Sequence, residues 1–209
     1  MRGHRAAGSA LGEALALERL AALLTARGRL EEGRDALDEG IAVAERGLLR
    51  QHALTRLHAT EARNRIAAGA LRAAEDAVRE ASETAARHGA CVACDAAFRP
   101  EMVRVLLLRG RVADAEGEAA QLEEIARQRG GRVFGAVARL TRARVLAAQG
   151  RTSDALEALA AARAAFVSAG HRYEAARCAR VEVRLRGPGA EIPDEVRALD
   201  LLVVVDADA

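Results

Sequence analysis

Residues 148–170 read AQGRTSDALEALAAARAAFVSAG, and this stretch decides the fold. An Ala- and Leu-rich segment lies between Gly150 and Gly170. Alanine is the strongest helix former, and glycine ends helices because it adopts left-handed backbone geometry at little cost. Ala155, Leu159 and Ala162 are spaced four and three residues apart, so they share one stripe of such a helix. The stretch therefore predicts one helix between two tight turns, with small, large and small residues along its packing face.

Two series of glycines repeat this arrangement along the chain. The first series, with spacings of 41, 41 and 40 residues, consists of Gly28, Gly69, Gly110 and Gly150. The second series lies between its members, with spacings of 42, 41 and 40 residues, and consists of Gly47, Gly89, Gly130 and Gly170. A shared period of about 41 residues is typical of a helical solenoid. We therefore predict an all-α fold in which helix A, a turn, helix B and a second turn repeat.

Small residues recur at fixed positions after the first series. Five positions after each of these glycines lie Gly33, Ala74, Ala115 and Ala155. Twelve positions after each of them lie Gly40, Ala81 and Ala162, with Leu122 as the exception. Between these two sets are Leu37, Val78, Ala119 and Leu159. This pattern predicts the face on which each helix B packs against its helix A.

The small–large–small order after the turn resembles the tetratricopeptide repeat, as in Ala155, Leu159 and Ala162. The segment Arg29-Leu30-Glu31-Glu32 and the segment from Ala165 to Arg177 resemble the longer repeats of bacterial ATP-dependent transcription regulators of the maltose-activator and LuxR type. The resemblance covers residues 11 to about 187. It implies a right-handed α-solenoid, with the A helices on the concave face, that acts as a sensor or scaffold in a bacterial regulatory system.

The repeat predicts three parts of the chain. Residues 1–9 form a frayed N-terminus, and residues 10–187 form a tetratricopeptide-like domain of four A/B hairpins plus a fifth A helix. After Gly187-Pro188-Gly189 the period fails. Residues 188–209 are then expected to hold a short capping helix from Pro193 to about Leu201, followed by a β-prone tail.

Composition excludes several classes of function. We find no segment approaching the roughly 18 apolar residues of a membrane-spanning helix, and no apolar secretory signal, so a cytoplasmic protein is expected. The 209 residues contain no Gly-rich phosphate loop and no Ser/His/Asp order with supporting glycines, so we expect no enzyme. Apart from His, every basic residue is Arg; a GC-rich genome and selection for bidentate anion contacts both explain this.

Charge is divided unequally between the two kinds of predicted helix. The A helices carry 16 Arg and 5 acidic residues, whereas the B helices carry 11 Arg and 17 acidic residues. If the A helices line a concave groove, as the resemblance implies, this groove would attract an acidic protein or peptide. Nucleic acid is a poorer partner, since stacking aromatics are nearly absent. The candidate partner-binding residues are Arg56, Arg63, Arg99, Arg104, Arg139, Arg142, Arg177 and Arg180. Alternatively, these arginines pair with acids on neighbouring helices.

A Cys-x-x-Cys motif supports a rival function, a metal site or a redox switch. His88, Cys91 and Cys94 fall within seven residues at a predicted helix start, which favours thiolates. Cysteine and histidine are ligands for Zn²⁺ and other soft metal ions. A fourth ligand is expected from His52, because His52 follows Gly47 by five residues as Cys94 follows Gly89.

Two further observations bear on this motif. Pro100 falls inside the same helix, where it removes a hydrogen bond and is expected to kink or restart the helix. In the alternative interpretation, Cys91 and Cys94 replace Ala at tight helix contacts, because a free cysteine behaves as a small buried hydrophobe. No cofactor is then needed.

Overall fold

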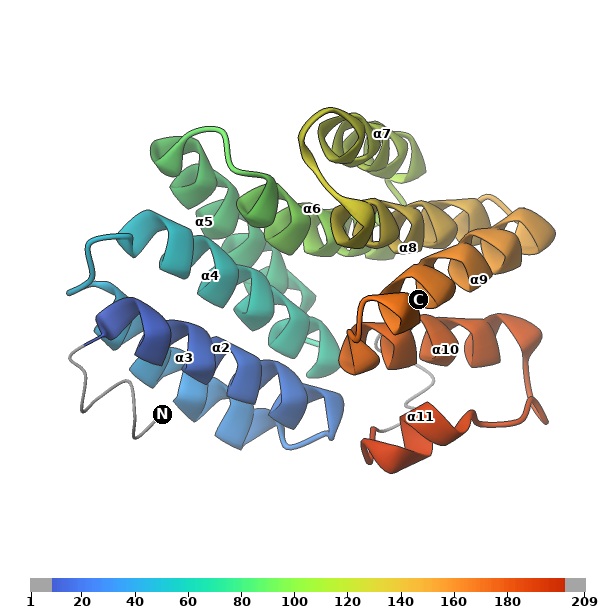
Figure 1. The fold of residues 1–209 in the computed structure, drawn as a ribbon, viewed down its shortest axis with the longest axis horizontal. Helices are drawn as coiled ribbons and strands as arrows, with labels where there is room; N and C mark the ends of the chain where they lie inside the picture. Colours follow the sequence, from blue (N-terminus) through green and yellow to red (C-terminus); the bar gives the residue numbers. More distant parts are fainter. Residues whose placement is uncertain (1–8, 202–209) are drawn as a thin grey trace. The chain divides into compact units, whose positions relative to one another are not determined.

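The computed structural model describes residues 9–201 and shows a succession of helices (Figure 1). The first five are α2 (Ala10–Ala26), α3 (Leu30–Ala44), α4 (Arg50–Ala67), α5 (Leu71–His88) and α6 (Val92–Leu108). The others are α7 (Val112–Arg129), α8 (Arg132–Ala148), α9 (Thr152–Ser168), α10 (Arg172–Arg186) and α11 (Asp194–Ala198). Between residues 9 and 201 there is no strand, which confirms the all-α prediction. Right-handedness and a regular superhelical period stay predictions.

The chain divides into two compact units, one ending at Glu101 and the other beginning at Met102. In the first unit, α2 packs against α3 and also against α4, and α4 packs against α5. Its core contains Leu17 of α2, Leu37 of α3 and Leu57 of α4, each no more than 1% exposed. Consecutive helices therefore share one continuous apolar layer.

The second unit has the same neighbour-to-neighbour packing. Helix α8 packs against α7 and α9, α10 packs against α9, and α11 packs against α10. Phe166, Leu159 and Cys178 lie in its largest apolar cluster and are fully buried. The capping helix is shorter than the predicted span, since α11 begins after Pro193 and ends at Ala198.

The glycines of the first series end helices as the sequence predicts, and so do Gly89 and Gly170. In the second series Gly47 lacks the predicted left-handed geometry, and Gly130 is extended with a φ of −93°. Gly150 has a φ of 77°, in the left-handed region that favours glycine. The amide of Arg151 donates to the carbonyl of Leu146 at 2.9 Å, which satisfies an end carbonyl of α8 in the Schellman pattern. The same amide-to-carbonyl bond closes α2, α4 and α6.

The predicted packing stripe is confirmed by burial. All its members are buried, and Ala155, Leu159 and Ala162 are fully so. Space is tightest at Gly40, where an added Cβ would lie 2.7 Å from Leu57 Cδ2. Small residues thus allow helix B to approach the helices beside it closely.

Helix α6 does not restart at Pro100 but continues as one α-helix from Val92 to Leu108. Proline has no amide proton, so the carbonyl of Ala96 loses its normal intrahelical partner. The N-terminal turns of α6, which contain Cys94, are therefore connected to the rest of the helix by one hydrogen bond fewer.

Candidate metal centre

Three helices of the first unit bring the four predicted metal ligands to the same place. His52 lies in the first turn of α4, and His88 is the last residue of α5. Gly89 then reverses the chain with a φ of 89°. Cys91 stands immediately before α6, where its carbonyl accepts from the amide of Asp95 at 3.0 Å, and Cys94 lies in the first turn.

The ligand atoms of these four residues all lie within 4.8 Å of one another. His52 Nδ1 lies 3.4 Å from Cys94 Sγ and 3.7 Å from Cys91 Sγ. The rings of His52 and His88 have centroids 5.5 Å apart and are tilted by 53°. The fourth ligand predicted from the sequence, His52, therefore faces both cysteines of the motif.

The donor set fits a tetrahedral zinc ion. Zinc binds imidazole nitrogen at about 2.0–2.1 Å and thiolate sulfur at about 2.3 Å, so its ligand atoms are separated by roughly 3.3–3.8 Å. The distances from His52 Nδ1 to the two sulfurs, 3.4 and 3.7 Å, fall in this interval. All three cysteines are free thiols. Two imidazoles and two sulfurs can thus hold a borderline-soft ion after small side-chain rotations.

Burial controls the protonation of two of these ligands. Burial lowers the pKa of His52, and the charges of Arg56 and His88 lower it further, which favours the neutral ring needed for coordination. Burial and the adjacent Cys91 raise the pKa of the Cys94 thiol to about 12, against the opposing influence of Thr55 and Arg56. Without a cation, Cys94 is therefore protonated at neutral pH.

The buried carboxylate of Glu18 pairs with Arg56, whose guanidinium lies beside the site. Glu18 of α2 accepts from Thr60 Oγ1 at 2.9 Å and from Arg56 at 3.3 Å. Glu18 is only 4% exposed. Arg56 lies one helical turn after His52, and its charge acts on His52 and Cys94. This role of Arg56 is not among the sequence-based predictions; the four-residue spacing from His52 is the signal that places both on one face of α4.

Most of the predicted partner-binding arginines have partners within the fold. Ion pairs join Arg56 to Glu18, Arg63 to Glu101, Arg99 to Asp95, Arg142 to Glu116 and Glu123, and Arg177 to Glu174. Arg104 is 2% exposed and Arg180 is half-buried. Arg139 is exposed. This placement favours the interpretation in which these arginines pair with acids, several of them on neighbouring helices.

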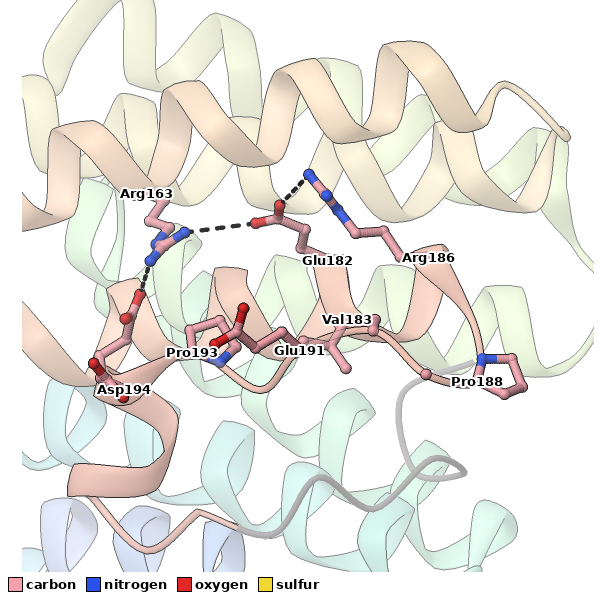
Figure 2. Close-up of a pocket in the computed structure, with 11 residues that line it drawn as sticks. Arg163, Glu182, Val183, Arg186, Pro188, Glu191, Pro193 and Asp194 are labelled. Carbon is pink, nitrogen blue, oxygen red and sulfur yellow. Dashed lines mark ion pairs between the residues drawn. The ribbon is translucent and has the colours of Figure 1, made fainter.

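A hollow of about 770 Å³ lies elsewhere, in the second unit, beside α9, α10 and the segment leading to α11 (Figure 2). Four of its charged side chains pair with one another: Arg163 joins Glu182 and Glu195, and Arg186 joins Glu182. The other two, Glu191 and Asp194, are exposed and pair with Arg197. Arg163 thereby links α9 to α10 and α11. These pairs fasten the short capping helix, and they leave the hollow without a convergent set of ligand-binding groups.

None of the helices described is both long and apolar enough to cross a membrane. No protein-family model matches the chain, and no curated protein matches its sequence. The chemistry of His52, His88, Cys91 and Cys94 is therefore the strongest indication of function.

Proposed function

We propose that this protein binds a zinc ion through His52, His88, Cys91 and Cys94, and that the ion fastens α4 to the turn between α5 and α6. The observation that carries the proposal is the convergence of four ligand atoms from three helices within 4.8 Å. Packing alone explains this convergence less well. His52, His88 and Cys91 are half-buried and polar, whereas Cys178, a cysteine that serves packing, is fully buried.

The charge of the site also suits a zinc ion. Two thiolates and two neutral imidazoles balance one divalent cation, and Glu18 balances the adjacent Arg56. Two sulfur ligands favour zinc over magnesium or calcium, which prefer oxygen. The half-buried ligands leave the ion accessible for exchange, so the chain is suited to respond to the metal supply.

The proposal is tested by competition of the purified full chain with a zinc chelator. We expect one zinc ion per chain, and a tetrahedral S₂N₂ visible spectrum when cobalt replaces zinc. Changing any one ligand to alanine should weaken binding by more than the roughly 10–100-fold that loss of an outer-shell partner costs.

Matched controls come from the same residue types. His58 lies on α4 like His52, but its ring faces Glu61 at 3.4 Å. Cys178 is buried in the second unit. His58→Ala and Cys178→Ala should leave zinc affinity unchanged. Equal effects from ligand and control variants would refute the site.

Binding of an acidic protein through the arginines is the second candidate, and Arg139 is the exposed member that favours it. A polyglutamate peptide serves as the probe. Its affinity should fall with added salt and with Arg139→Glu, whereas the control Arg129→Glu, on α7, should have less effect. Arg142 is unsuitable for this test because reversing its charge would break its pairs with Glu116 and Glu123.

A further inference from the structure

We infer that Cys91 is a modification site for hydroperoxides, and that Cys94 converts the oxidised Cys91 to a disulfide and so releases the metal ion. This inference rests on the zinc site proposed above, and it adds the regulation of that site. It assigns different tasks to the two cysteines, although both serve as ligands to the same ion.

Exposure and backbone position distinguish the two sulfurs. Cys91 is half-buried, whereas Cys94 is 1% exposed, so an oxidant in solution reaches Cys91 first. Cys91 precedes the first turn of α6, and its carbonyl accepts from the amide of Asp95 at 3.0 Å, whereas Cys94 lies within that turn.

Cys94 is placed to react with oxidised Cys91. The two sulfurs lie within 4.8 Å of each other, at positions three residues apart across the helix start. A disulfide requires them to approach to about 2.05 Å. Two features flank the segment from Cys91 to Cys94 and permit local movement. Gly89 precedes it with left-handed geometry, and Pro100 follows it and removes one hydrogen bond of α6.

The reaction is balanced with hydrogen peroxide as the two-electron oxidant. The Cys91 thiolate attacks one peroxide oxygen, an S–O bond forms, the O–O bond breaks, and hydroxide leaves. The Cys94 thiolate then attacks the sulfur of the sulfenic acid, an S–S bond forms, the S–O bond breaks, and a second hydroxide leaves. Two protons convert the hydroxides to water, and the zinc ion loses both sulfur ligands.

The metal-bound state and the disulfide state of Cys91 and Cys94 connect different segments of the chain. The metal ion joins His52 on α4 to residues 88–94, whereas a Cys91–Cys94 disulfide closes only a short loop and leaves His52 out. Apolar packing remains, since Ala59 of α4 packs with Ala81, Ala85, Cys94 and Phe98, and Ala53 and Leu54 pack in the core shared with α2 and α3. Oxidation therefore removes the link that the ion makes through His52, at the first turn of α4.

The experiment uses the full-length Cys178→Ala chain, loaded with zinc and titrated with hydrogen peroxide. Zinc release is followed with a chromophoric chelator, free thiols are counted, and the intact mass is measured. We expect zinc to leave in step with both thiols, and the mass to fall by two hydrogen atoms. A thiol reductant plus zinc should restore the starting state. Amide exchange in the first turns of α4 should rise on oxidation, while that of α8 stays constant.

A Cys94→Ala variant of the same chain separates the two steps. Oxidation of this variant should stop at a sulfenic acid on Cys91, which a cyclic diketone reagent traps. Zinc release without an internal disulfide, or oxidation of both sulfurs to sulfinic acids, would overturn this inference and leave the zinc site standing. Failure of the reduced chain to bind zinc would overturn both.

Discussion

His52 Nδ1 lies 3.4 Å from Cys94 Sγ, although the two residues are 42 positions apart in the sequence. An ion held by both connects the start of α4 to the start of α6. Zinc should therefore stabilise the folded chain, by about 2.7 kcal/mol at a free concentration 100 times the dissociation constant. The melting temperature with and without zinc measures this effect.

The controls for that measurement are ligand variants. His52→Ala should abolish the zinc-dependent rise in melting temperature, and His58→Ala should retain it. A rise that persists in His52→Ala would show that zinc stabilises the chain from another position.

The metal-free protein should lose stability at high pH. The pKa of Cys94 is raised from 9.0 to about 12, so the unfolded chain releases this proton first. The stabilising contribution is complete below pH 9 and is lost as the pH rises from 9 towards 12. Cys178, whose pKa burial also raises to about 12, acts in the same direction.

Urea unfolding of the metal-free chain between pH 8 and 11 tests this linkage. The free energy of unfolding of the Cys94→Ala, Cys178→Ala double variant should depend less on pH than that of the parent. Parallel curves for the two proteins would contradict the assignment. This range extends from one unit below to two units above the unperturbed thiol pKa of 9.0.

Replacement of Glu18 by alanine should destabilise the first unit. It removes the acceptor of Thr60 and Arg56 and leaves Arg56, whose side chain is 16% exposed, without its carboxylate. We expect a loss of about 2–4 kcal/mol, somewhat below the roughly 3–5 kcal/mol of a fully buried pair. Chemical denaturation measures it. Glu31→Ala, which removes an exposed pair with Arg34, should change stability by less than about 0.5 kcal/mol.

Ala155→Leu should destabilise the second unit by about 1–3 kcal/mol, because the site is fully buried and the added atoms overpack it. Ala164→Leu is the matched control, since Ala164 is exposed on the same helix. A neutral effect at Ala155, measured by thermal unfolding, would mean that the helix B stripe tolerates larger residues.

The fold was predictable because local rules determine it. Left-handed glycines end the helices at Gly28, Gly69, Gly110 and Gly150, and the packing stripe follows from helical spacing. The grouping of His52, His88, Cys91 and Cys94 was predictable for the same reason, since corresponding positions in adjacent repeats lie at the same level. The equal spacing of His52 from Gly47 and of Cys94 from Gly89 predicts the contact between His52 and Cys94 that the structure shows.

The charged network was not predictable in this way. Counting arginines on the A helices gives a net charge, but the field at a surface depends on how each guanidinium is paired. Arg56 pairs with Glu18, which is 38 residues away, and Arg63 pairs with Glu101, also 38 residues away. Such pairs depend on side-chain rotamers and burial, which periodicity does not encode.

The alanine-rich packing stripe also affects how stability varies with temperature. Alanine and glycine at the helix contacts expose little apolar surface when the chain unfolds, compared with leucine or phenylalanine. The heat-capacity change of unfolding should therefore fall below the usual value of about 12–15 cal/mol/K per residue. A smaller heat-capacity change flattens the curve of free energy against temperature, so this chain should keep a nearly constant stability over a broad range and resist denaturation by cold.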